Sequence, residues 1–347
     1  MSKRVLELKS QSQDCTRWDD YVDKHNDGTF FHLSGWRNVI SQVYGHTPHY
    51  LFLEQEGNVC GVLPLFEQKS ILFGHVLVST PFCVYGGAIA DDSEGLLVLE
   101  EAAADLAKRL RVDYLELRYT KPRENNPALT LNCHHSTFIS ALAEDEKSIL
   151  QSIKKKQRAN VRQSLKNDLV ATETNDISEV HSIYSESVRN LGTPVFPKSY
   201  FTALKNEFGD RVELLTVKKD KVAVSAVLSF YYKNAVLPYY GGGTPDARHC
   251  RSNDFMYYTL MCRSKLLRGC TSFDFGRSKN NSGSGNYKKT WGLEPTPLYY
   301  YCQLIQAKEL PNLSPDNPKY KLFIETWKKL PLFVSERIGP YLSKYLG

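Results

Sequence analysis

Apolar and polar positions follow one order of elements that occurs twice along the chain. Apolar residues at helical spacing predict helices, and alternating or continuous short apolar runs predict strands. The first copy consists of two helices, two strands, a helix and a strand, at residues 18–24, 33–44, 50–53, 59–66, 95–110 and 114–118. The second copy has the same order, at residues 177–190, 200–208, 212–217, 222–232, 253–267 and 272–277. This repeat predicts two α/β domains of similar size.

Two strand ends support the duplication. Tyr85-Gly86-Gly87 in the first half matches Tyr240-Gly241-Gly242 in the second. An acidic residue followed by an apolar residue and an arginine also occurs in both halves, as Glu116 to Arg118 and as Asp274 to Arg277. The glycines either relieve a strained turn or allow a ligand to approach the backbone closely.

Length and charge limit the classes of function. The chain has 347 residues, of which 41% are hydrophobic, so it can bury two cores. Its net charge of +6 is too small for a dedicated nucleic-acid binder and suits an anionic partner at a local patch. We expect domains at residues 1–143 and 144–310 and an amphipathic tail at 311–347.

Cysteine usage and the amino terminus indicate a cytoplasmic protein. The eight cysteines form no C-x-x-C pair, which is typical of free thiols in a reducing compartment, and no second cluster gives zinc spacing. The first residues carry charges without an apolar segment behind them, so no signal peptide is expected. Residues 70–90 are apolar but are broken by His75, Pro81 and a Gly-Gly pair, and they predict strands and turns rather than a membrane span.

The strand ending at Asp274-Phe275-Gly276-Arg277-Ser278 is the strongest candidate site. It runs into a polar loop, residues 279–286, and then to Lys288. Arg277 and Lys288 therefore flank Gly, Ser and Asn residues whose backbone N–H groups suit a phosphate. The alternative is a flexible hairpin loop with solvated cations. Neither a phosphate-binding Walker loop nor a G-x-S-x-G nucleophile motif is present.

Residues 147–166 predict a single basic helix. Its apolar stripe consists of Ile149, Ile153, Val161 and Leu165. Lys155, Arg158 and Arg162 share the opposite side. This side is either a solvated face or a surface for a polyanion.

Aromatic residues and the tail allow two interpretations each. Trp36 and Tyr85 either line a cleft or belong to a core cluster. Residues 320–347 mix apolar and basic side chains, which fits a membrane interface. Pro331 and Pro340 interrupt any long helix, however, so we expect the tail to pack on the second domain.

The order of elements resembles the Gcn5-related N-acetyltransferase (GNAT) fold. Its duplication resembles the FemAB group of aminoacyltransferases, and in particular the branch associated with exosortase/PEP-CTERM and exopolysaccharide systems. The motifs that carry the likeness are Phe31-His32-(x3)-Trp36, Tyr44-Gly45-His46, Tyr85-Gly86-Gly87, Lys156-(x)-Arg158-(x3)-Arg162, Phe273-Asp274-Phe275-Gly276-Arg277-Ser278 and Tyr287-Lys288-(x2)-Trp291-Gly292. The likeness implies an α/β fold of two tandem GNAT-like domains with mixed central sheets.

The resemblance also implies acyl or aminoacyl transfer to an amine. Lys288 matches the family's functional lysine and would hold the phosphate or the carbonyl in the transition state. Asp274 is either the base or a residue that orients Arg277. The implied substrate-binding residues are Arg277, Ser278, Tyr240, Arg158, Arg162, Tyr85 and Trp36.

The resemblance implies a phosphate-bearing donor and an amine-bearing sugar or peptide precursor. The candidate donors are acyl-CoA, an acyl carrier and aminoacyl-tRNA, and the implied place is the cytoplasm or the inner face of the membrane. Residues 145–167 leave room for a single helix where FemAB enzymes often have a long helical arm for tRNA. The glycine loop that holds pyrophosphate, R/Q-x-x-G-x-G/A, is replaced by Arg248 to Asn253, which argues against free acetyl-CoA. The alternative function is a non-catalytic nucleotide- or carbohydrate-binding member of a polysaccharide system.

Overall fold

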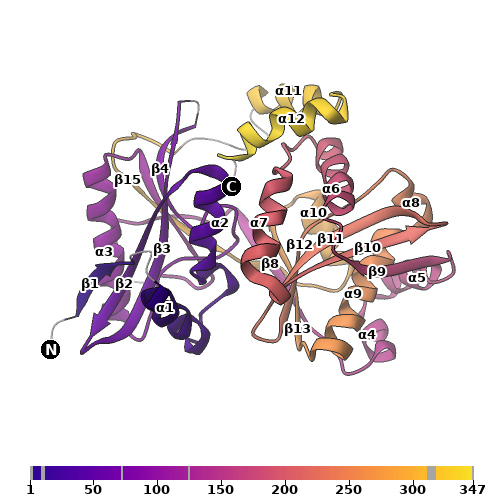
Figure 1. The fold of residues 1–347 in the computed structure, drawn as a ribbon, viewed down its shortest axis with the longest axis horizontal. Coiled ribbons are helices and arrows are strands. Elements are labelled where there is room, and N and C mark those ends of the chain that lie inside the picture. The colour runs from indigo at the N-terminus through magenta and orange to yellow at the C-terminus, as the bar shows by residue number, and fades with distance from the viewer. Residues whose placement is uncertain (1–2, 9–11, 72, 124–125, 311–317, 346–347) are drawn as a thin grey trace. The chain divides into compact units, whose positions relative to one another are not determined.

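The chain folds into two α/β units, each with its own sheet (Figure 1). The computed structural model describes residues 3–8, 12–71, 73–123, 126–310 and 318–345. Unit 1 consists of Met1–His135, Pro297–Asn312 and Tyr345–Gly347, and unit 2 of Ser136–Thr296 and Leu313–Lys344.

Unit 1 has a mixed sheet with helices against it. The strands are β1 (Arg4–Glu7), β2 (Thr47–Gln55), β3 (Asn58–Ser70), β4 (Gly74–Ser79), β5 (Ile89–Ala90), β6 (Tyr114–Tyr119), β7 (Thr130–Asn132) and β15 (Tyr299–Leu304). The helices are α1 (Ser12–Lys24), η1 (Phe30–His32), α2 (Gly35–Tyr44) and α3 (Ser93–Leu110). The strand order is β1-β2-β3-β4-β6-β15-β7, in which β4 and β6 are parallel. Gly45 ends α2 at a left-handed φ of 66°, as predicted.

Unit 2 repeats this plan. The strands are β8 (His135–Ala141), β9 (Leu169–Thr174), β10 (Val212–Lys219), β11 (Val222–Tyr232), β12 (Ala235–Gly243), β13 (Ser272–Lys279) and β14 (Thr296–Pro297). The helices are α4 (Glu146–Ser152), α5 (Lys155–Ser164), α6 (Ile177–Leu191), α7 (Lys198–Phe208), η2 (Gly209–Arg211), α8 (Asp246–Cys250), α9 (Ser252–Arg268), α10 (Gly283–Thr290), α11 (Pro318–Trp327) and α12 (Leu332–Ser343). The sheet order is β14-β8-β13-β12-β11-β10-β9, in which β12 and β13 are parallel.

The units divide the chain differently from the predicted ranges. β15 lies after the second repeat in sequence but pairs with β6 and β7 in the sheet of unit 1. β8 precedes the second repeat and lies beside β13 in the sheet of unit 2. Residues 136–143 therefore belong to unit 2 and residues 297–310 to unit 1. A local apolar pattern predicts a strand but does not tell which sheet the strand joins.

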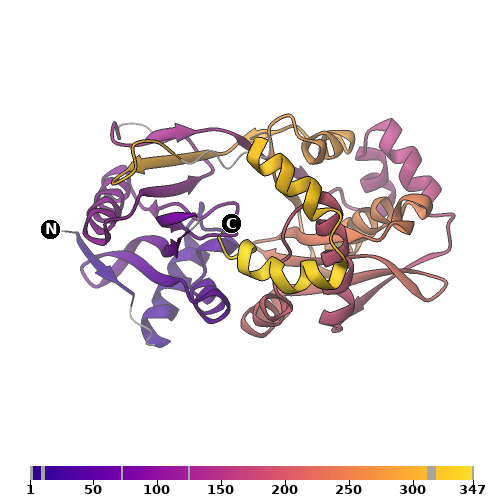
Figure 2. The same ribbon diagram turned by 90° about the horizontal axis from the view of Figure 1, so that it is seen from above.

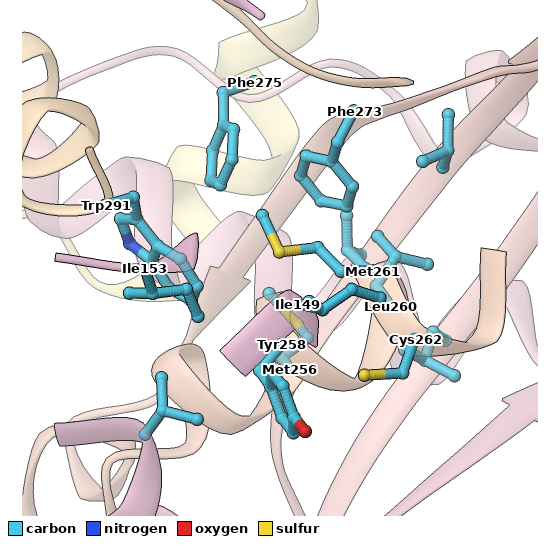
Figure 3. Packing of buried hydrophobic residues seen from close by; sticks show 14 of the residues in the cluster. Ile149, Ile153, Met256, Tyr258, Leu260, Met261, Cys262, Phe273, Phe275 and Trp291 are labelled. Carbon is cyan, nitrogen blue, oxygen red and sulfur yellow. The ribbon is translucent and has the colours of Figure 1, made fainter. Parts of the chain in front are cut away.

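The core of unit 2 holds β13 and the segment after α10 in place. Phe273 and Phe275 alternate with Asp274 along β13, and the rings of Phe275 and Trp291 lie 5.6 Å apart. Figure 3 shows Ile153 beside Trp291 in this cluster. The aromatic core thus fixes the strand that carries the candidate site.

The predicted single helix over residues 147–166 is wrong. The structure has α4 and α5, with Ile153 between them in extended conformation (φ −70°, ψ 138°). Ile149, Ile153 and Val161 are buried as predicted, but Leu165 is exposed. The break follows from packing, because it turns the Ile153 side chain into the core beside Trp291.

Candidate active site

Helix α10 takes up the second half of the polar loop that the sequence predicted at residues 279–286. The Ser282 hydroxyl accepts a hydrogen bond from the Gly285 N–H (3.2 Å) and caps the helix. Tyr287 and Trp291 are four residues apart, so both aromatic rings lie on one face. Trp291 packs on Phe275 of β13. This anchoring holds Lys288, the residue that follows Tyr287, against the end of β13.

The Lys288 ammonium lies on two backbone carbonyls. Nζ donates to the oxygens of Gly276 (2.8 Å) and Arg277 (2.9 Å), and it lies 5.3 Å from the centre of the Phe138 ring on β8. Burial lowers the pKa of Lys288 to about 8; the charge of Arg277 acts in the same direction and that of Asp274 opposes it. A protonated lysine has three N–H donors, so one remains after the two carbonyls are satisfied.

Asp274 shapes the backbone that receives Lys288. The buried carboxylate accepts hydrogen bonds from the Gly276 N–H (2.8 Å) and from the Thr137 hydroxyl (3.2 Å). Gly276 has a φ of 70°, which strains any residue with a side chain. Asp274 and Gly276 therefore form a fixed turn whose carbonyl is presented to Lys288.

Arg277 and Ser278 follow on the same strand. Arg277 is half-buried, and its charge acts on Lys288. Ser278 is buried, and its hydroxyl is without a hydrogen-bond partner in the structure. A buried hydroxyl in this state has the capacity to bind a ligand. Lys288, Asp274 and Arg277, which the sequence singled out, are thus brought together, and Ser278 is the next residue of the same strand.

The strands β12 and β13 separate at this place in the sheet. They pair at Ala235 with Ser272 and at Val236 with Phe273, before the strand ends that carry the site. The register of β12 against β11 shifts there, so that Tyr239 has no opposite residue. The sheet consequently opens toward the carboxyl ends of β12 and β13.

The structure places Tyr240 in an aromatic cluster. Its ring packs against Tyr184, Phe196, Phe201 and others, and its hydroxyl lies 3.0 Å from that of Tyr200. These contacts describe a core residue, and we leave it out of the proposed site.

The glycines after Tyr240 give room to packing elements. A Cβ on Gly242 would collide with Ser187 of α6, and one on Gly243 would meet Ala247 of α8 at 2.5 Å. Helices α6 and α8 thus occupy the space beside these glycines.

The basic residues of α5 have two environments. The Arg158 guanidinium donates to the carbonyl of Ile153 (3.0 Å) and thereby stabilises the turn between α4 and α5. Lys155 and Arg162 are exposed. Arg158 therefore stabilises the fold through its side chain, whereas Lys155 and Arg162 are exposed to solvent.

The segment from Arg248 to Asn253 forms the end of α8 and the start of α9. Arg251 has a left-handed φ of 55° at the position where the pyrophosphate loop has a glycine. The N–H groups of Ala247 and Arg251 bond to Thr244 and Arg248 within this turn. These N–H groups are therefore not directed at a ligand.

The equivalent strand end in unit 1 is closed. The Arg118 N–H donates to the Ser79 hydroxyl (2.9 Å), and the Arg118 carbonyl accepts from Gly87 (2.7 Å), so the chain after β4 is fastened to β6. The Arg118 guanidinium is 4% exposed and bonds to Glu116 (2.8 Å) and to the carbonyl of Cys83 (2.7 Å). Internal partners therefore hold this arginine.

Unit 1 contains a cavity of about 140 Å³ beside Gly86 to Ala90. Tyr85 and Arg118 are among its lining residues. The lining cations Lys121 and Arg123 are paired with Asp27 and with buried Glu100. Trp36 is fully buried and bonds to the carbonyl of Phe30 (2.9 Å), which supports its interpretation as a core residue.

Thr137 and Phe138 are the site residues that sequence reasoning missed. Both lie on β8, more than one hundred positions before Asp274. Their only local signal is the strand-like pattern of residues 135–141. In the part of the chain that the structure describes, no group of three or more metal-ligating residues is gathered, and no helix is long and apolar enough to cross a membrane.

Comparisons with known proteins bear on the fold of the chain. Residues 147–289 match the family model of the acetyltransferase (GNAT) domain. No curated protein matches the chain by sequence.

Solved structures share the fold at low sequence identity. FemX is 15% identical, with 92% of this chain and 100% of FemX covered and a TM-score of 0.66. The C-terminal domain of a protein named as a lysylphosphatidylglycerol synthetase, from Agrobacterium fabrum, is 13% identical, with 84% and 92% covered and a TM-score of 0.56. A tandem GNAT protein from the clavulanic acid biosynthesis pathway is 11% identical, with 89% and 100% covered and a TM-score of 0.52.

These matches confirm the predicted fold class of tandem GNAT-like α/β domains with mixed sheets. The assignment to the PEP-CTERM branch stays a prediction. The segment that matches the GNAT acetyltransferase domain model, residues 147–289, contains β9 to β13 and Lys288.

Proposed function

We propose that unit 2 transfers an activated acyl group to an amine and that Lys288 is the catalytic residue. The observation that carries the proposal is the fixed ammonium at the end of β13, where the sheet opens. When an amine attacks the acyl carbonyl, the C–N bond forms and negative charge develops on the carbonyl oxygen. A donor already aimed at that oxygen stabilises the transition state, because no reorganisation is needed.

Lys288 supplies this donor in its protonated form. Two of its N–H groups are held by Gly276 and Arg277, which leaves the third for the acyl oxygen. Arg277 and the Ser278 hydroxyl lie on the same strand and are the binding groups for a phosphate on the donor. The leaving group then departs with the electron pair of the broken acyl bond and takes up the proton that the amine loses, directly or through water.

Asp274 acts as a positioning residue in this proposal. Its carboxylate already accepts from Gly276 and Thr137, so it fixes the turn on which Lys288 rests. Replacement by Asn is expected to lower turnover through Lys288 while the fold remains.

The acceptor that we propose is an amine-bearing sugar or peptide precursor of the cell envelope or of an exopolysaccharide. The resemblance to the FemAB group of aminoacyltransferases and the fold shared with FemX support an acceptor of this kind. We place the enzyme in the cytoplasm, where activated donors are made.

The test compares two adjacent lysines of α10. Lys288→Met is expected to slow product formation by a factor that corresponds to about 2–4 kcal/mol, as for loss of a donor to a developing oxyanion. Lys289→Met removes an exposed charge one position away and should leave the rate within about twofold. Product formation is followed by mass spectrometry with acyl-CoA and aminoacyl-tRNA donors and a panel of amino sugars and peptides. Equal rates for the two folded variants would remove Lys288 from the mechanism.

The donor is tested by calorimetry. Because the segment that replaces the glycine loop has no glycine and the N–H groups of Ala247 and Arg251 are bonded internally, we expect free acetyl-CoA to bind more weakly than about 100 μM. Micromolar binding would show that side chains replace the missing backbone donors and that acetyl-CoA is a donor.

A further inference from the structure

The two C-terminal helices of unit 2 present large apolar side chains to solvent. Leu322 on α11 and Phe333 and Tyr341 on α12 are 73%, 72% and 77% exposed, and Phe323 and Ile338 are also exposed. Isolated exposed apolar residues are ordinary, but such a group on two adjacent helices marks an interaction surface. We call Leu322, Phe323, Phe333, Ile338 and Tyr341 the outer apolar face.

Helix α12 buries small residues and exposes large apolar ones, the reverse of an ordinary surface helix. Its buried positions are Ser335, Gly339 and Ser343, which are four residues apart and share one side. A Cβ on Gly339 would lie 2.9 Å from Val195, so the small residues let α12 lie close to the chain after α6. The helix therefore buries its small side and turns Phe333, Ile338 and Tyr341 outward.

Helix α11 is anchored to the same part of unit 2. Ile324 touches Gly192 at the end of α6, and Trp327 is buried. The carbonyl of Leu330, between the helices, accepts from Arg189 of α6 (3.0 Å). The expected packing of the tail on the second unit is thus present, and the two helices lie together at α6 (Figures 1 and 2).

The positive charge of this segment indicates a negatively charged partner. Residues 318–344 contain six lysines and arginines and only Glu325 and Glu336, for a net charge of +4 out of +6 for the whole chain. Lys321, Lys329 and Arg337 are exposed beside the outer apolar face. Apolar and aromatic side chains bordered by basic ones are the composition of a helix that lies in the interface of an anionic bilayer.

We propose that α11 and α12 dock this protein on an anionic membrane surface. The outer apolar face enters the headgroup region, and Lys321, Lys329 and Arg337 contact lipid phosphates. The helices do not cross the membrane, and this inference stands independently of the proposed transfer reaction.

The experiment is flotation of the full chain with vesicles. The probes are vesicles of phosphatidylcholine alone and vesicles that also contain about 30% phosphatidylglycerol. The parent protein should float with the anionic vesicles at least about tenfold more than with the neutral ones. Binding should fall as salt rises from about 50 to about 300 mM, because salt screens the lysine and arginine charges.

Variants separate this surface from general adhesion. The triple variant Phe333→Ser, Ile338→Ser, Tyr341→Ser should lose flotation by about tenfold or more and keep its thermal unfolding, since these side chains face solvent. The matched control replaces Val170, Val222 and Leu267, equally exposed apolar residues of unit 2, by Ser and should float like the parent. Lys321→Gln, Lys329→Gln, Arg337→Gln should remove most of the preference for anionic vesicles.

Two results would overturn the proposal. The parent protein does not float with anionic vesicles, or the triple serine variant floats as well as the parent. If the parent that fails to float is a dimer and the triple variant is a monomer, the face is instead a contact between two copies of this chain.

Discussion

In both units a pair of parallel strands lies within the sheet, and an arginine follows an acidic residue near the end of the second strand of the pair. In unit 1 this arginine, Arg118, is buried and bonded to Glu116 and Cys83, and its backbone fastens the chain after β4. In unit 2 the corresponding Arg277 is half-buried, and its carbonyl receives Lys288. The same motif therefore closes the sheet in unit 1, whereas in unit 2 its backbone supports Lys288, the residue that we propose as catalytic.

The difference shows what a repeated fold leaves free to change. The order of elements and the parallel pair are set by packing and occur in both units. A few side chains decide whether polar groups at the strand end are bonded within the unit or remain for a ligand. Ser79 bonds the backbone of Arg118 in unit 1, and Lys288 keeps one N–H in unit 2. Fold similarity alone consequently does not tell which unit carries chemistry.

The largest expected difference between the two units is in the free energy of unfolding when each arginine is replaced by alanine. Arg118→Ala leaves Glu116 and the Cys83 carbonyl without their partner and should cost about 3–5 kcal/mol of unfolding free energy, as for a broken buried pair. Arg277→Ala should cost about 1 kcal/mol or less, because the side chain is partly solvated. Urea unfolding measures both. Similar losses for the two variants would show that Arg277 is also a structural residue.

A smaller effect concerns the basic helix α5 of unit 2. Arg162→Gln should reduce the slope of log affinity for bulk tRNA against log salt by about 0.7–0.9 and leave the melting temperature unchanged, because Arg162 is exposed. Arg158→Gln should instead lower stability by about 1 kcal/mol, since its guanidinium bonds the Ile153 carbonyl. Fluorescence anisotropy over a salt series gives the slopes. An unchanged slope in Arg162→Gln would leave α5 as a solvated face.

Local patterns in the sequence predicted the repeated elements well. The apolar run at 222–232 is β11, and the helical spacing at 95–110 and 177–190 lies within α3 and α6. These patterns depend on neighbouring residues, which fold into the expected element wherever it packs.

Long-range packing decided what the sequence did not show. Residues 147–166 have helical spacing throughout, yet Ile153 leaves the helix to reach the core beside Trp291. Residues 279–286 are rich in Gly, Ser and Asn, but the cap by Ser282 and the anchor at Trp291 make the second half of them the first turn of α10. Thr137 reaches Asp274 because β8 joins the second sheet.

The pH dependence of acyl transfer tests the central claim most directly. The acceptor amine must be neutral to attack, so its own titration affects the parent and a Lys288→Arg variant alike, and the ratio of the two rates isolates Lys288. If protonated Lys288 donates to the acyl oxygen, the parent's advantage must fall as pH rises through the pKa of about 8, since deprotonation removes the third donor. Lys288→Arg keeps a positive charge at every accessible pH and is the reference. The account predicts that the ratio of the parent rate to the Lys288→Arg rate declines with a midpoint near pH 8. A ratio that instead rises through pH 8 would contradict it, because neutral Lys288 would then be the active form.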